Sequence, residues 1–235
     1  MSSSSPESAA SAQASAPTAS PPSSLSFDPR EFEMVDVQPS EVEFLQTLKE
    51  KRTAENKGDQ LIVTYKVRVR EKDCVLKVFK GNESFHQYWA EYQAYLMLDS
   101  NGFCKRGDAY GSFTTMRNPP SAILIEFIPN AARIELKNFS QPNIDKLCQI
   151  LREFHDIGLL HGDPYPRNMM VVQGPPDRVF WLDFDSSQIV DREKLDDRTE
   201  HFFAEEAEMM DFFAKGLAKD AENGKLEEVW ACYYE

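Results

Sequence analysis

Cysteine is scarce in this chain, and long apolar runs are absent. The four cysteines are Cys74, Cys104, Cys148 and Cys232 among 235 residues, and none forms a Cys-x-x-Cys pair. This spacing argues against a disulfide framework and against a zinc site. No apolar run approaches transmembrane length, and no basic segment followed by an apolar one opens the chain. We therefore expect no membrane span or secretory signal, and a cytoplasmic or nuclear location.

Positive charge is also in short supply. The chain has 26 Lys and Arg residues against 39 Asp and Glu, so its formal net charge is −13, and no long basic block interrupts this acidity. A nucleic-acid backbone or an anionic membrane would require a basic surface, so we predict neither as a partner. No pattern in the sequence specifies an oligomeric state.

Apolar residues are nearly missing from the beginning of the chain. Residues 1–24 are almost wholly Ser, Ala, Pro, Gln and Thr. Such a segment cannot bury enough apolar surface to offset the entropy of ordering, so we predict a disordered tail over residues 1–26. Residues 27–57 are then expected to form an N-terminal extension. It would contain a short helix at 40–52, because Val42, Leu45 and Leu48 recur at helical spacing.

The next segments show the patterns of two paired strands and a helix. Residues 61–70 alternate apolar and polar side chains, a turn follows at Glu71, and residues 74–80 continue as a second strand. A helix is predicted to begin at Ser84 and to carry Glu91 near its middle.

Further along, the pattern predicts one more strand, two helices and a hairpin. The strand covers residues 121–129, and a helix with an apolar stripe runs from about residue 140 to Gly158. Two apolar runs around the Gly-Pro-Pro-Asp turn at 174–177 predict a β-hairpin. A helix over 199–218 is expected to place Glu205, Glu206 and Glu208 on its solvent face.

The most informative stretch is residues 161–185, HGDPYPRNMMVVQGPPDRVFWLDFD. It places Asp163 and Asn168 in a loop before the predicted hairpin, and Asp183 directly after it. Two carboxylates and one carboxamide at one edge of a hairpin can orient a hydroxyl group and offer Mg²⁺ the oxygen ligands that it prefers.

This arrangement resembles the catalytic loop and metal-binding motif of the protein-kinase-like superfamily. The H-G-D-x-x-P-x-N and D-F-D motifs are similar to those of lipopolysaccharide kinases, RIO-type kinases and aminoglycoside phosphotransferases. The resemblance implies an α+β, two-lobed protein-kinase-like fold over residues 58–235. An N-lobe would cover about 58–128, and a reduced C-lobe about 129–235.

The resemblance also assigns ATP and Mg²⁺ as cofactors and gives each motif residue a role. Asp163 would accept or orient the proton of the acceptor hydroxyl, and Arg167 would offset charge on the phosphates. Asn168 and Asp183 would coordinate Mg²⁺. Asp185 stands where many kinases have glycine, and two interpretations remain open: a further metal ligand, or a cap for the next turn.

Other residues match the parts of the family that hold ATP. Lys77, steadied by Glu91, would contact the phosphates, and Val75 would cover the adenine from above. Alternatively, Lys77 is a solvated lysine, and Lys80 competes for Glu91. The resemblance further implies that Met170 lies beneath the adenine, with Ile125 behind it. The backbone of the 126–128 segment, at Glu126 and Ile128, would hydrogen-bond to the base.

One part of the family pattern is missing. Kinases usually have a Gly-x-Gly-x-x-Gly turn before the lysine strand, where backbone N–H groups approach the phosphates. Here Gly58 is the only glycine that precedes Lys77. With this departure, the resemblance implies an atypical kinase, and the expected acceptor is a hydroxyl of a protein Ser or Thr. The alternatives are a small-molecule hydroxyl kinase and a nucleotide-binding pseudokinase scaffold.

Overall fold

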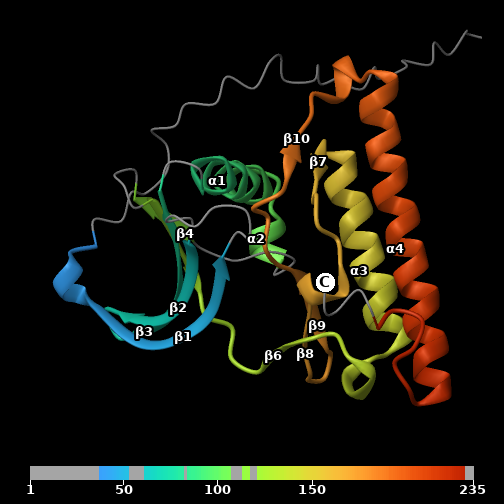
Figure 1. The fold of residues 1–235 in the computed structure, drawn as a ribbon, viewed down its shortest axis with the longest axis horizontal. Helices are drawn as coiled ribbons and strands as arrows, with labels where there is room; N and C mark the ends of the chain where they lie inside the picture. Colours follow the sequence, from blue (N-terminus) through green and yellow to red (C-terminus); the bar gives the residue numbers. More distant parts are fainter. Residues whose placement is uncertain (1–36, 53–60, 82–83, 107–112, 117–120, 231–235) are drawn as a thin grey trace, which may run out of the picture. The chain divides into compact units, whose positions relative to one another are not determined.

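Antiparallel sheets and helices are combined in an α+β arrangement (Figure 1). The computed structural model describes residues 37–52, 61–81, 84–106, 113–116 and 121–230. The predicted tail at 1–26 and the Lys57-Gly58-Asp59 turn lie outside the described residues. No helix in the described part of the chain has the length and apolar character needed to cross a lipid bilayer.

The first half of the described chain is built on one five-stranded antiparallel sheet in the order β1-β2-β3-β5-β4. The strands are β1 Val42–Arg52, β2 Leu61–Val69, β3 Lys72–Lys80, β4 Phe113–Met116 and β5 Ser121–Glu126. The predicted strands at 61–70, 74–80 and 121–129 are thus confirmed, because their period-two alternation matches a sheet with two different faces.

The predicted helix at 40–52 is wrong. Residues 39–41 form only a 3₁₀ turn, η1 (Pro39–Glu41), and the chain then continues as β1, paired along its whole length with β2. Leu45 and Leu48 are extra residues at two irregularities in this pairing. Such bulges interrupt the alternation of a strand, and here they leave Val42, Leu45 and Leu48 at a spacing of three, which imitates a helix. Residues 42–52 therefore belong to the sheet and not to a separate extension.

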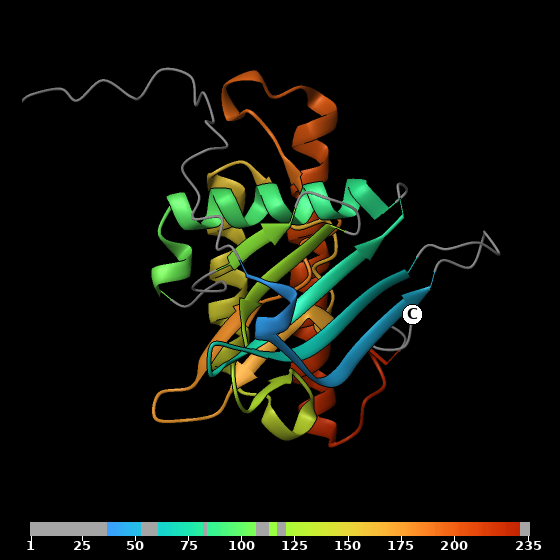
Figure 2. The same ribbon diagram turned by 90° about the vertical axis from the view of Figure 1, so that its left-hand side faces the viewer.

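Helix α1 (Phe85–Ser100) crosses one face of this sheet and contacts β3 and β5 (Figure 2). Glu91, Tyr95 and Leu98 are among its buried residues. A one-turn helix, α2 (Phe103–Arg106), follows it. The helix predicted from Ser84 is confirmed, and its buried side fixes the position of Glu91 relative to the sheet.

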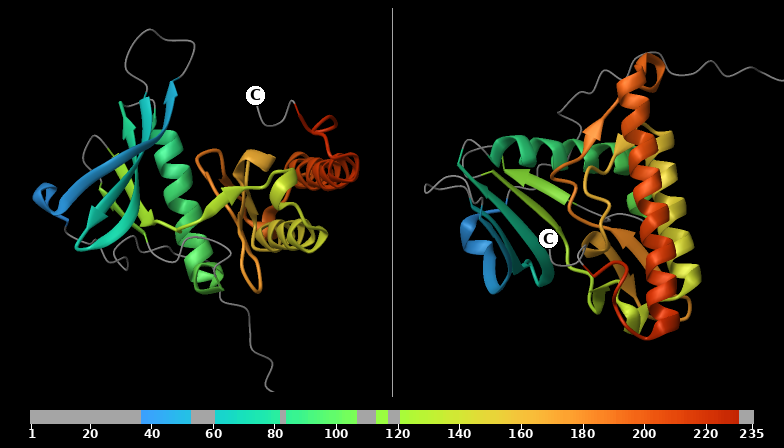
Figure 3. Two further views of the ribbon diagram at one scale, coloured as in Figure 1. Left: turned by 90° about the horizontal axis from the view of Figure 1, so that it is seen from below. Right: turned by 45° about the vertical axis from the view of Figure 1, so that its right-hand side comes forward.

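The second half of the described chain contains two long helices and small sheets. Strands β6, β8 and β9 form a three-stranded sheet, and β7 pairs with β10. The elements are β6 Ala131–Arg133, η3 Leu136–Asn138, α3 Gln141–Asp156, β7 Leu159–Leu160, η4 Pro166–Asn168, β8 Met169–Val172, β9 Arg178–Trp181, β10 Gln188–Ile189, η5 Arg192–Lys194 and α4 Asp197–Asn223. Helices α3 and α4 lie side by side (Figure 3), and α3 also packs against β9.

Local signals explain where these elements begin and end. Ser140 caps α3 by accepting a hydrogen bond from the backbone N–H of Asn143, and Gly158 follows in a left-handed conformation. The predicted hairpin is formed by β8 and β9. Helix α4 is longer than predicted at both ends, because Asp196 rather than Thr199 caps its start and Gly224, in a left-handed conformation, follows its last residue.

Trp181 connects the hairpin to α3. Its ring is fully buried, and its indole N–H donates to the backbone carbonyl of Leu147 at 3.1 Å. The buried side chains of Phe154, Phe180 and Phe184 are among those that complete the core at this point. The loop between β7 and β8 and the segment after β9 are therefore both joined to this packed core. These two segments carry the acidic groups of the predicted motif.

Candidate functional site

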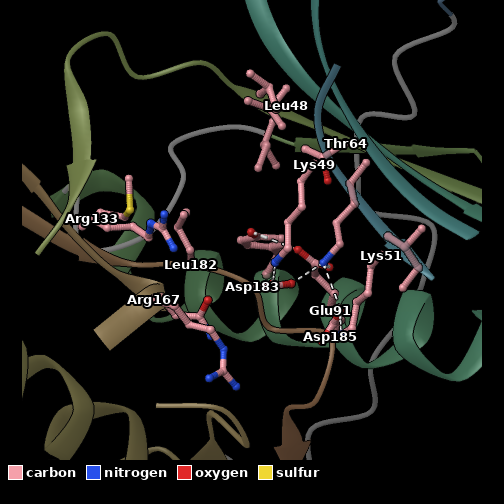
Figure 4. A pocket seen from close by; sticks show the side chains of 17 residues that line it. Leu48, Lys49, Lys51, Thr64, Glu91, Arg133, Arg167, Leu182, Asp183 and Asp185 are labelled. Carbon is pink, nitrogen blue, oxygen red and sulfur yellow. Dashed lines mark hydrogen bonds and ion pairs between the residues drawn. The ribbon is translucent and has the colours of Figure 1, made fainter. Parts of the chain in front are cut away.

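A cavity of about 440 Å³ lies between the five-stranded sheet, α1 and the β8–β9 hairpin (Figure 4). The residues predicted from the sequence that line it are Val75, Lys77, Glu91, Ile125, Arg167, Asn168, Met170 and Asp183. They come from β3, α1, β5, η4, β8 and the segment after β9. The structure thus gathers residues from separate sequence segments around one cavity.

Lys77 is the centre of the charged wall of this cavity. Its Nζ lies 2.6 Å from Glu91 Oε2, 2.5 Å from Asp183 Oδ1 and 3.3 Å from Asp185 Oδ2. The side chain is only 10% exposed. Lys77 is therefore not a solvated surface lysine, and Glu91 is paired with it rather than with Lys80.

Burial and charge act in opposite directions on the titration of this cluster. Burial by itself lowers the pKa of Lys77, but the three carboxylates around it raise that pKa well above its ordinary value. Burial raises the pKa of Asp183, but Lys77 and Lys49 hold it well below its ordinary value. Burial raises the pKa of Glu91 to about 7, against the opposing effect of Lys77. Lys77 and Asp183 are thus charged at neutral pH, and Glu91 takes up a proton more readily than Asp183.

The loop that contains Asp163 is organised by its own side chains. Asp163 Oδ1 accepts a hydrogen bond from Arg167 Nη2 at 2.6 Å, and its Oδ2 accepts one from Asn168 Nδ2 at 2.8 Å. The same amide nitrogen also donates to the backbone carbonyl of Asp163 at 2.8 Å. Proline at Pro166 begins the short turn η4 that places Arg167 and Asn168 on the cavity side. The turn therefore brings a carboxylate, a guanidinium and a carboxamide together.

Glu206 of α4 holds this loop in place through hydrogen bonds. Its carboxylate accepts hydrogen bonds from the backbone N–H of His161 at 3.1 Å and of Gly162 at 2.7 Å, and His155 Nε2 lies 2.5 Å away. These partners lower the pKa of Glu206 although burial opposes them. The prediction that Glu206 lies on the solvent face of its helix is wrong, because the loop needs an acceptor for its buried N–H groups. Glu205, in contrast, is exposed, as predicted.

His161 is a packing residue in this structure. The side chain is fully buried, its ring contacts those of Trp181 and Phe184, and burial lowers its pKa. Its Nδ1 lies 3.3 Å from the backbone N–H of Asp163, and that N–H donates to it. A neutral imidazole in this position holds the loop and the segment after β9 together.

Two predicted contacts with the adenine base do not correspond to cavity residues. Glu126 and Ile128 are not among the residues that line the cavity. Glu126 pairs with Cys74 on β3, which places its side chain on the opposite face of the sheet. The backbone N–H between these two residues, at Phe127, donates to the carbonyl of Asp73 at 3.2 Å. The side chain of Glu126 therefore points away from the cavity, and the hydrogen bonds predicted from the backbone at Glu126 and Ile128 to an adenine base stay a prediction.

Several lining residues were missed from the sequence. Lys49 Nζ lies 2.9 Å from Asp183 Oδ2, and Lys51 Nζ lies 3.2 Å from Asp185 Oδ2. Both lysines lie on β1, the segment that was predicted to be a helix. Their Lys-x-Lys spacing was the available signal, because it places both side chains on one face of a strand. Leu48 of the same strand and Arg133 of β6 also line the cavity.

The oxygen donors of the site fit a hard cation such as Mg²⁺. Asp183 and Asp185 supply carboxylates. The amide nitrogen of Asn168 is committed to Asp163, so its oxygen is the side-chain atom that remains for a cation. Among the described residues there is no group of three or more His, Cys, Asp or Glu side chains placed to hold a metal ion. Asn168 would therefore have to be one of the ligands, together with water or substrate oxygens.

No protein-family model matches this sequence, and no curated protein matches it.

Proposed function

We propose that this chain is a protein-kinase-like phosphotransferase that binds Mg·ATP in the cavity and transfers the γ-phosphate to a hydroxyl group. The observation that carries this proposal is the contact of Lys77 with both Glu91 and Asp183, at 2.6 Å and 2.5 Å. These residues lie on β3, on α1 and after β9, and the family motif pairs them for phosphate binding and metal binding.

The fold supports the same proposal in outline. The five-stranded sheet with α1 corresponds to the N-lobe of a two-lobed kinase-like fold, which would begin at β1 and not at residue 58. The region from β6 onward corresponds to a reduced C-lobe with α3 and α4 as its main helices. In this proposal Val75 and Met170 would enclose the adenine from opposite sides of the cavity.

Charge favours a polyanionic ligand. Among the described residues, five basic and three acidic side chains line the cavity, namely Lys49, Lys51, Lys77, Arg133 and Arg167 against Glu91, Asp183 and Asp185. A positive cavity in a chain with a net charge of −13 is a local exception that needs a reason. A nucleoside triphosphate provides one, because its phosphates would be attracted into a partly desolvated positive site.

The loop residues have the chemical capacities that the reaction requires. Bound Mg²⁺ would neutralise charge on the phosphates, with Asn168, Asp183 and Asp185 as its protein ligands. The acceptor hydroxyl oxygen would form a bond to the γ-phosphorus while the bond to the β–γ bridging oxygen breaks, which leaves ADP. Asp163 would take the hydroxyl proton, and Arg167, 2.6 Å from Asp163, would stabilise charge on the transferred group.

Two classes of hydroxyl acceptor are compatible with this reaction. A protein Ser or Thr is our first proposal, and a small-molecule hydroxyl is the second. A different class of function, the pseudokinase scaffold, is favoured by one observation: Lys49 and Lys51 occupy Asp183 and Asp185, the proposed metal ligands. The retention of Asp163 argues against that scaffold, because nucleotide binding alone has no chemical need for this residue.

The test is Mg²⁺-dependent ATP turnover by the full chain, which requires no knowledge of the acceptor because kinases hydrolyse ATP slowly to water. We expect Asp163→Asn and Asp183→Ala each to lower turnover by at least about 100-fold. Asp211→Asn, at an exposed site on α4, is the matched control and should leave turnover unchanged. If the parent binds ATP without turning it over, the scaffold replaces the enzyme. If the parent neither binds nor hydrolyses ATP, the proposal is wrong.

A further inference from the structure

The cavity has two lysines that the usual kinase pattern does not include. Lys49 and Lys51 lie two residues apart on β1, so both side chains leave the same face of the sheet. Figure 4 shows them reaching from β1 toward Asp183 and Asp185. Their side chains are 54% and 44% exposed, whereas those of the two aspartates are 15% and 2% exposed. The lysines are thus the solvated partners of these ion pairs, and the aspartates are the buried ones.

The pairing of the strands explains why Lys49 and Lys77 meet on one carboxylate. Lys49 is paired with Thr64 on β2, and Thr64 is paired in turn with Lys77 on β3. The two lysines therefore lie in one row across three strands, with α-carbons about 10 Å apart. Their ammonium groups converge on Asp183, Lys77 on Oδ1 and Lys49 on Oδ2.

The sequence lacks the glycine-rich turn that kinases usually have before the lysine strand. No glycine-rich turn precedes Lys77, and Gly58 is the only earlier glycine. Backbone N–H groups at such a turn would normally approach the phosphates. An ammonium group on a long flexible side chain offers three donors and a full charge, and it needs no glycine to approach an anion.

We propose that Lys49 and Lys51 bind the nucleotide phosphates in place of a glycine-rich turn, and that they hold Asp183 and Asp185 only while the nucleotide is absent. The inference rests on the nucleotide-binding function proposed above. On binding, the two ammonium groups move from the aspartates to phosphate oxygens, and the aspartates become available to the cation that accompanies the nucleotide. The lysines can make this move because their side chains are about half exposed and flexible, and Asp183 and Asp185 each keep Lys77 as a second partner.

This exchange of partners predicts that removing the two lysine charges weakens the binding of ATP and strengthens the binding of Mn²⁺. Lys49→Gln/Lys51→Gln removes two phosphate donors, so we expect the dissociation constant of ATP to rise at least tenfold. Affinity for adenosine, which has no phosphate, should change less than twofold. Affinity for Mn²⁺ alone, measured by electron paramagnetic resonance, should rise several-fold because the aspartates have lost two competing cations. A merely structural role of the lysines would weaken both ligands together.

Two control variants distinguish the loss of positive charge in the cavity from a change in the folding of the chain. Lys72→Gln removes one lysine charge from β3 at an exposed site about 16 Å along the strand from Lys77, and it should leave ATP affinity unchanged. Lys49→Arg/Lys51→Arg keeps both charges and should keep ATP affinity within about threefold. If the arginine pair loses as much affinity as the glutamine pair, or if Lys72→Gln does, then the lysines do not act as phosphate ligands and the inference is wrong.

The results also distinguish this inference from the function on which it rests. A parent chain that binds ATP, with a glutamine pair that binds it equally well, overturns the role of the lysines and leaves the nucleotide site intact. A parent chain that binds neither ATP nor adenosine overturns both. A glutamine pair that binds ATP weakly, adenosine normally and Mn²⁺ more tightly is the result that we expect.

Discussion

The loop that carries Asp163 and the segment that carries Asp183 are held by different kinds of partner. The loop is fixed by Glu206, a buried carboxylate that accepts hydrogen bonds from two backbone N–H groups. Asp183 is held by side chains, and one of them, Lys49, is 54% exposed. Backbone donors cannot leave without unfolding the loop, whereas a solvated lysine can change partner. The loop with Asp163 is thus the permanent side of the site, and the segment with Asp183 is the side that we propose to be exchangeable.

The permanent side should show the largest loss of stability. Glu206→Ala leaves the N–H groups of His161 and Gly162 and the ring of His155 without their acceptor in a buried place. We expect the free energy of unfolding to fall by about 4 kcal/mol, measured by urea denaturation. Glu205→Ala, at the exposed neighbouring position, should change it by less than about 0.5 kcal/mol. Equal losses for the two variants would show that the buried network is not the anchor.

The cost of gathering three carboxylates around Lys77 should be visible in the pH dependence of stability. The pKa of Glu91 is about 7 in the folded chain and 4.5 for an ordinary glutamate. The folded state therefore binds a proton more tightly than the unfolded state between these values, so the contribution of Glu91 is greatest below pH 4.5 and is lost as the pH rises to 7.

The size of this effect follows from the pKa shift. From pH 4.5 to pH 8 the parent should lose up to about 3 kcal/mol relative to Glu91→Gln, because the glutamine cannot ionise. Urea denaturation across this range measures the difference, with Glu205→Gln as an exposed control. Parallel curves for the parent and Glu91→Gln would mean that Glu91 is ionised throughout the range.

The exchangeable side should show the smallest effect on folding. Lys49→Gln and Lys51→Gln remove ion pairs whose lysine partners are about half exposed. We expect each to change the free energy of unfolding by less than about 1 kcal/mol without nucleotide, because solvent screens such pairs. Thermal denaturation of each variant beside Lys72→Gln provides the measurement. A loss as large as that of Glu206→Ala would remove the distinction between the two sides.

Prediction from the sequence succeeded where the information is local. Three patterns were predicted correctly: the alternation in β2 and β3, the apolar stripe of α3 and the turn within the β8–β9 hairpin. Each of these patterns is formed by residues that are close together in the sequence. The motif residues from Asp163 to Asp183 were predicted as one group, and Arg167, Asn168 and Asp183 line one cavity. The predicted hairpin grouped Asp163, Asn168 and Asp183, and the resemblance added Arg167.

Prediction failed where the partner is distant in the sequence. Nothing near Glu206 indicates that the N–H group of His161, 45 positions earlier, requires an acceptor. The lysines of β1 escaped notice because the irregular pairing at Leu45 and Leu48 disguises the strand. Only the pairing with β2 determines which residues of β1 face the cavity, and that pairing cannot be read from β1 itself.

Because β1 has an extra residue at each bulge, it could lose that residue without changing the direction in which its other side chains point. Thr47 is paired with Tyr65 and Lys49 with Thr64, two neighbours on β2, although Leu48 lies between Thr47 and Lys49. Deletion of Leu48 would close the bulge and leave both pairs in place, so the lysines would keep their direction. Deletion of Glu50 would make the two lysines adjacent and turn one of them to the opposite face. A deletion at position 48 would thus leave the charged side chains in place, whereas a deletion at position 50 would change the charge of the cavity.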